Sequence, residues 1–91
     1  MQLSEKPTKL NKAQRKAILG RFRQGAKGYI LIDEILRRKG LTRKEMISIN
    51  TCANPTSFIH NAINPRILEL GYWIAKSPKT EKWSVHSVEG F

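Results

Sequence analysis

The sequence contains few of the residues that form disulfides, metal sites or membrane spans. Cys52 is its single cysteine and cannot form an internal disulfide, and with two histidines it gives no spacing typical of a zinc site. No segment approaches the roughly 20 apolar residues that cross a bilayer, and the N-terminus has no apolar core of signal-peptide type. We therefore expect a cytoplasmic protein without a membrane segment, a metal or another cofactor.

Groups that could catalyse a reaction together are missing as well. His60 and His86 have no accompanying carboxylate pair, nucleophile or glycine-rich phosphate loop. Acid–base catalysis needs its partners within hydrogen-bond reach, so the sequence argues against an enzyme. At 91 residues the chain has room for one domain with a modest core.

Acidic residues are scarce, and this is the strongest compositional signal. Seven Asp and Glu face 17 Lys and Arg, which gives a formal net charge of +10. Residues 1–40 alone hold eleven basic and three acidic side chains. Such a skewed excess favours a polyanionic partner, most often nucleic acid. A basic surface that only keeps the protein soluble is the alternative.

The first half of the chain predicts an arm and two helices. Residues 1–10 show no periodicity and are expected to form a flexible basic arm. Asn11 is a candidate N-cap for an additional basic helix over residues 11–24. After a glycine-rich break, residues 29–39 form a second amphipathic helix that ends at Gly40.

The second half, residues 42–88, predicts helix, turn, helix and hairpin. Thr42 and Glu45 have capping-box spacing, and Asn54-Pro55 is a second helix start. Strands are expected over residues 72–76 and 82–88. Two groups of apolar residues should face the core, one from each helix: Met46, Ile47 and Ile49, then Ile59, Ile63, Ile67 and Leu70. The preceding Leu41 is expected to cross the sheet as a very short strand.

Pro65 interrupts the second of these helices. An internal proline costs roughly 3 kcal/mol unless the helix kinks or restarts. Asn64 as a fresh N-cap, with Pro65 as the first residue of a new turn, would absorb this cost. In that case only residues 55–63 would form the recognition segment, the part of the helix that contacts a ligand. The alternative is that the helix kinks at Pro65 and continues without a new start.

Polar side chains on the outer positions of helix 54–64, and one just beyond it, are of the kinds that address DNA base edges. These candidate base contacts are Thr56, Ser57, His60, Asn61 and Arg66. The candidate phosphate contacts are basic residues of the first helix, of the helix after Thr42 and of the hairpin: Lys12, Arg15, Lys16, Arg43, Lys44, Lys76, Lys79 and Lys82. Capping and solvation of a surface helix would also explain several of them.

Three stretches carry a resemblance to a known family. They are Cys52-Ala53-Asn54-Pro55-Thr56-Ser57-Phe58-Ile59, Leu70-Gly71-Tyr72-Trp73-Ile74 and Asn11-Lys12-Ala13-Gln14-Arg15-Lys16-Ala17-Ile18-Leu19. Together they resemble the small winged helix-turn-helix domains of bacteriophage and prophage proteins. The resemblance implies sequence-directed binding of double-stranded DNA by the second helix, with the hairpin, or wing, on the adjacent backbone or minor groove.

The resulting prediction is a mainly α fold with a small β-hairpin, of the α+β class. It is a winged helix-turn-helix of three to four helices plus a two-stranded wing, in a single domain over residues 11–91. Residues 29–88 would hold the helix-turn-helix and wing. The predicted function is that of a non-enzymatic phage-type transcriptional regulator in the bacterial host cytoplasm. Whether it forms a homodimer is left open.

Two other functions remain as alternatives. A protein-interaction module that binds and modulates a host protein would use Phe58, Trp73 and Phe91 as anchors. RNA binding is weaker, because no aromatic platform for single strands is visible. Steep salt dependence would favour nucleic acid over the protein partner.

Overall fold

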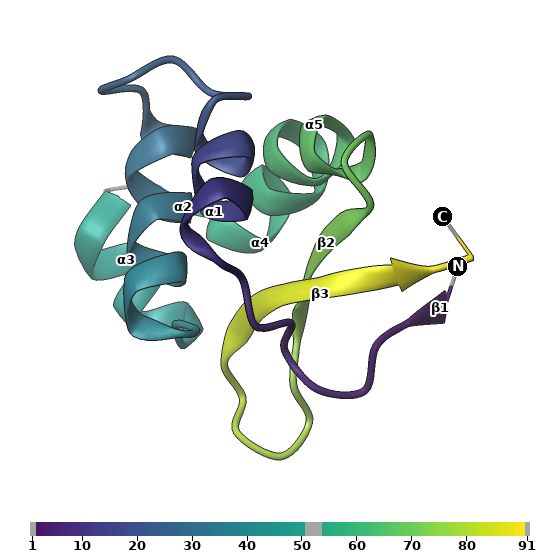
Figure 1. Ribbon diagram of the computed structural model, residues 1–91. Coiled ribbons are helices and arrows are strands. Elements are labelled where there is room, and N and C mark those ends of the chain that lie inside the picture. The colour runs from purple at the N-terminus through teal and green to yellow at the C-terminus, as the bar shows by residue number, and fades with distance from the viewer. Residues whose placement is uncertain (1, 51–53, 91) are drawn as a thin grey trace.

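The computed structural model describes residues 2–50 and 54–90 and has an α+β architecture (Figure 1). Its elements in chain order are β1 Gln2–Leu3, α1 Lys12–Leu19, α2 Lys27–Arg38, α3 Arg43–Asn50, α4 Pro55–Phe58, η1 Ile59–Ile63, α5 Asn64–Leu68, β2 Tyr72–Lys76 and β3 Trp83–Glu89. The segments α4, η1 and α5 follow one another directly, so we treat them as one helix, residues 55–68. The predicted α+β class is confirmed.

Local capping signals define most of the helix starts. Asn11 Oδ1 accepts a hydrogen bond from Gln14 N, and Asn11 N donates to Gln14 Oε1, so α1 begins with a full capping box. Asn54 Oδ1 likewise accepts from Ser57 N at 3.2 Å. However, α1 ends at Leu19 instead of near residue 24, and the chain then turns so that Phe22 enters the core.

The core lies between the helices and the inner face of the sheet. It is almost wholly aliphatic, and its buried members are Ile18, Phe22, Leu31, Ile32, Ile35, Leu41, Met46, Ile59, Ile63, Ile67, Ile74 and Val85. The isoleucines of helix 55–68 are buried as their spacing predicted. In α3 the prediction is partly wrong: Met46 is fully buried, but Ile47 is 38% exposed because it lies on the outer side of this short helix.

The strand β3 is the centre of the sheet. It pairs antiparallel with β2 on one side, where Ile74 lies opposite Val85, and with β1 on the other. Leu41 forms a bridge with Trp83 at the start of β3, as the very short strand predicted there. The two described ends of the chain therefore lie side by side (Figure 1).

The N-terminal segment differs from the flexible arm that the sequence predicted. Beyond β1, Ser4 N donates to Ser87 O and Thr8 N donates to Val85 O, both at 2.9 Å. His86 is buried beneath this segment, with its Nδ1 2.9 Å from Ser4 O. The prediction failed because the partners are some 80 positions away in sequence, where no local pattern reveals them.

Pro65 is accommodated by a wide turn and not by a new helix start. Pro65 has no N–H to donate, and its ring would collide with a carbonyl of the preceding regular turn. The segment η1 is π-helical: Asn64 N donates to Ile59 O, five residues earlier. Asn64 itself has helical backbone angles, φ −57° and ψ −42°, so its predicted role as a fresh N-cap is wrong.

The side chain of Asn64 instead joins the helix to the hairpin. It is fully buried, its Nδ2 donates to Ile74 O at 3.1 Å, and its Oδ1 accepts from Ile74 N at 2.8 Å. Ile74 faces Val85 across β2 and β3, but its own N–H and C=O both point to the outer edge of β2. The amide therefore satisfies two buried backbone groups where a further strand would otherwise have to pair.

We expect the Asn64→Ala substitution to lower the free energy of unfolding by about 2–4 kcal/mol, because each buried backbone group left without a partner costs about 1–3 kcal/mol. Asn61→Ala is the matched control, since Asn61 is an exposed asparagine of the same helix, and it should change stability by no more than about 0.5 kcal/mol. Urea unfolding followed by circular dichroism measures both. Equal effects of the two substitutions would contradict the role assigned to the Asn64–Ile74 pair.

Candidate nucleic-acid interface

Helix 55–68 presents a group of polar side chains on its outer side. Ser57, His60 and Asn61 are exposed and Thr56 is half-buried. Asn61 Nδ2 donates to Ser57 Oγ at 3.1 Å, which ties two of the predicted base contacts together. Asn61 keeps a second amide hydrogen, and its Oδ1 accepts no hydrogen bond from the described residues. The structure therefore brings Thr56, Ser57, His60 and Asn61 onto the first part of one helix.

His60 is turned toward the hairpin. Its ring centroid lies 6.3 Å from that of Trp73 on β2 and 6.2 Å from that of Trp83 on β3. The His60–Trp83 contact is edge-on, with an interplanar angle of 80°. Aromatic pairs in this range attract each other, so His60 helps to hold the hairpin against the helix. The sequence predicts the two strands but does not indicate this cluster.

Arg66 does not join the other predicted base contacts. It lies beyond the π turn, and its guanidinium carbon is 5.8 Å from the ring centroid of Phe22, in cation–π range. Phe22 belongs to the segment between α1 and α2. The neighbouring Arg21 forms an ion pair with Glu69 at 2.6 Å. Arg66 thus lies where helix 55–68 meets the α1–α2 connection.

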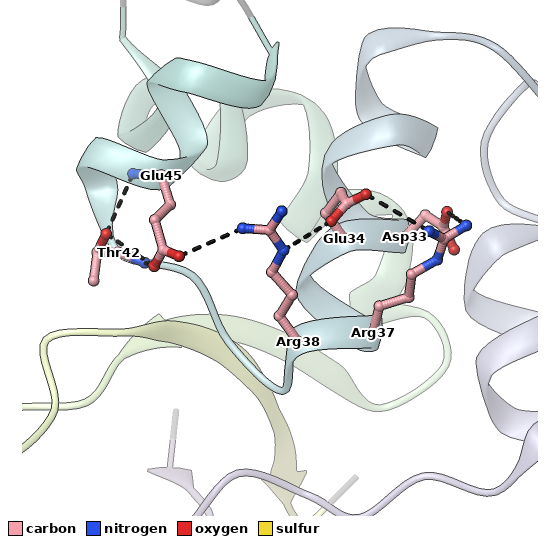
Figure 2. A network of polar contacts seen from close by, with 6 residues as sticks. All are labelled: Asp33, Glu34, Arg37, Arg38, Thr42 and Glu45. Atoms are coloured by element: carbon pink, nitrogen blue, oxygen red, sulfur yellow. Dashed lines mark hydrogen bonds and ion pairs between the residues drawn. The ribbon is translucent and has the colours of Figure 1, made fainter.

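The two arginines of α2 form ion pairs with three acidic side chains (Figure 2). Arg37 pairs with Asp33 at 3.3 Å, and Arg38 pairs with Glu34 at 3.0 Å and with Glu45 at 3.5 Å. None of the eight predicted phosphate contacts forms an ion pair with any residue that the structure describes. Their positive charge therefore stays available to an external anion.

Five of these eight cations lie on two neighbouring elements. Arg43 and Lys44 are exposed at the start of α3, and Lys76, Lys79 and Lys82 are exposed on the hairpin and its loop. Leu41, two residues before α3, forms a bridge with Trp83, which places the loop end of the two hairpin strands beside the start of α3. The hairpin loop projects away from the helices (Figure 1). The other three, Lys12, Arg15 and Lys16, border a groove between α1 and α2.

Glu45 is the acidic group at the junction of α3 and the hairpin. Thr42 N donates to Glu45 Oε1 at 3.0 Å and Thr42 Oγ1 accepts from Glu45 N at 3.2 Å, which confirms the predicted capping box (Figure 2). The backbone and hydroxyl hydrogen bonds of Thr42, aided by the charges of Arg38 and Lys82, hold the pKa of the Glu45 carboxyl below its ordinary value of 4.5.

Metal-binding clusters and membrane-spanning helices are two further features that the described residues lack. Among residues 2–50 and 54–90, no three His, Cys, Asp or Glu side chains gather where they could hold a metal ion. No helix in the same ranges is long and apolar enough to cross a membrane. Cys52, and Phe91 as a predicted protein-contact anchor, lie outside the described residues. No family model matches the chain, and neither curated proteins nor solved structures gave a match.

The depressed pKa of Glu45 predicts a pH-dependent contribution to stability. A carboxyl whose pKa is lower in the folded state stabilises the fold above its unfolded pKa, and this contribution disappears as the pH falls through the folded value. Thermal melts between neutral pH and below pH 4.5 should therefore show a smaller loss of Tm in Glu45→Gln than in the unsubstituted protein. Parallel curves for the two proteins would contradict this role of the capping box.

Proposed function

We propose that this protein binds double-stranded DNA through helix 55–68 and the hairpin, as a small winged helix-turn-helix regulator of the bacteriophage type. One observation carries the proposal: Ser57, His60 and Asn61 are exposed on a helix that is followed directly by a lysine-bearing hairpin. The sequence of elements from α2 through Leu41, α3 and helix 55–68 to β2 and β3 is also the order expected of such a domain.

In this proposal the first part of helix 55–68 enters the major groove. Asn61 offers an amide that can pair bidentately with adenine, while Ser57 and Thr56 can address several base edges. His60 lies against Trp73 and Trp83, so we assign it mainly to fixing the hairpin relative to the helix. No chemical step is required of any of these groups, and the proposed activity is binding alone.

Phosphate contacts come from the cations on either side of this helix. Arg43 and Lys44 begin α3, where the helix N-terminus itself attracts anions. Lys76, Lys79 and Lys82 would follow the backbone along the hairpin. These positions fix the register of the protein on the duplex but carry no sequence information, which falls to Thr56, Ser57 and Asn61.

The contribution of the hairpin can be measured by its salt dependence. Removal of one phosphate-binding cation should lower the slope of log K against log salt concentration by about 0.9, so Lys79→Ala should weaken binding to every duplex and reduce the slope by that amount. Arg37→Ala removes the same charge from an ion-paired position on α2 and is the matched control. Identical slopes for Lys79→Ala and the unsubstituted protein would rule out a phosphate contact by the hairpin loop.

The DNA sequence preference of the protein tests whether helix 55–68 contacts the bases. Selection of tight binders from a random duplex pool should give a consensus, and Asn61→Ala should relax it at one base position, at a cost of about 1–3 kcal/mol for that base. Competition binding with single-base variants measures the change. A uniform loss for every sequence would contradict direct readout by Asn61, and absence of binding even at low salt would contradict DNA binding altogether.

A further inference from the structure

Two grooves flank α1, and no residue of helix 55–68 lines them. The first, of about 610 Å³, lies between α1 and α2, and the second, of about 630 Å³, lies between α2 and the segment before α1. Both are lined by Arg15 and Leu36, so they adjoin each other. Neither is lined by a residue of α3, of helix 55–68 or of the hairpin loop. We call this pair of grooves the α1 surface.

The rim of the α1 surface is strongly basic. Six cations line the two grooves: Lys9, Lys12, Arg15, Lys16, Arg37 and Lys39. Asp33 is the one acidic residue in the lining, and Arg37 pairs with it at 3.3 Å. The other five cations form no ion pair within the described part of the chain. The surface therefore attracts negative charge.

The floor of the α1 surface is apolar. Leu19, Tyr29 and Leu36 line the first groove and are only partly buried. Leu10, which is also partly buried, lines the second groove. These side chains pack on the core from one side and leave the other side open. A ligand that covers them removes apolar surface from water, which favours binding.

We propose that the α1 surface binds an acidic amphipathic helix of a partner protein. Such a helix has apolar residues on one side for the floor and carboxylates beside them for the rim. A nucleic-acid backbone would use the cations but would leave the apolar floor uncovered. A second copy of this chain is disfavoured because each copy has a net charge of +10. The proposal goes beyond DNA binding and does not depend on it.

Fluorescence anisotropy with two labelled synthetic peptides tests the proposal. The first peptide is a helix with leucine and phenylalanine on one face and glutamate at the positions that flank this face, and the second has the same composition with its apolar residues scattered around the helix. We expect the first to bind about tenfold more tightly, because it alone presents a continuous apolar face while both carry the same charge. Equal affinities would mean attraction by charge alone and would overturn the proposal, as would absence of binding by the first peptide.

Charge reversals locate the site. Lys12→Glu with Lys16→Glu should weaken binding of the amphipathic peptide about tenfold or more, and Lys79→Glu with Lys76→Glu, at the hairpin, is the matched control that should leave it unchanged. Binding of random duplex DNA by the same variants separates this proposal from that of DNA binding. If the α1 variant loses DNA binding and retains peptide binding, then the α1 cations contact phosphate and the docking site is wrong. If no variant or unsubstituted protein binds DNA, the peptide result still decides the docking site.

Discussion

The pairing of the Asn64 side chain with the backbone of Ile74 is the interaction on which the arrangement of the fold depends. Two hydrogen bonds of 3.1 Å and 2.8 Å, both shielded from water, fix the last part of helix 55–68, at Asn64, against the outer edge of β2. Because β2 is paired with β3, and β3 in turn with Leu41 and β1, this contact sets the position of the helix relative to the entire sheet. A rigid relation between helix and hairpin is what a two-element DNA-binding surface requires.

Pro65 is the reason that such a pairing is possible. The proline forces the helix to widen, and the resulting π turn leaves both Ile63 and Asn64 on the buried side. An insertion of this kind rotates the residues after it relative to those before it. The helix thereby has two parts: the first carries the exposed polar group around Ser57 and Asn61, and the last packs against the sheet and Phe22. Pro65 would destabilise a regular helix, but here it directly follows the turn that places Asn64 on the buried side.

Electrostatics divide the molecule in a similar way. Arg21, Arg37 and Arg38 neutralise acidic groups, and most of the lysines extend into solvent around two different surfaces. One surface combines positive charge with polar side chains of a helix, and the other combines it with an apolar floor. Charge alone does not distinguish their partners, because any polyanion is attracted to both. The side chains that lie between the cations differ, and for this reason we propose DNA as the partner of the first surface and an acidic helix as the partner of the second.

The sequence by itself determined the local features: the caps at Asn11, Thr42 and Asn54, the buried isoleucines of helix 55–68, the hairpin and the excess of positive charge. Each of these depends on residues a few positions apart or on composition, so a pattern can reveal it. Only the tertiary structure decided that the N-terminal segment pairs with β3, that His60 meets Trp73 and Trp83, that Arg66 turns to Phe22 and that the α1 cations border a separate groove. These contacts join positions far apart in sequence. They form because the folded chain must pair its buried polar groups and cover its apolar surface at the same time. The periodicity of a single segment cannot predict such contacts.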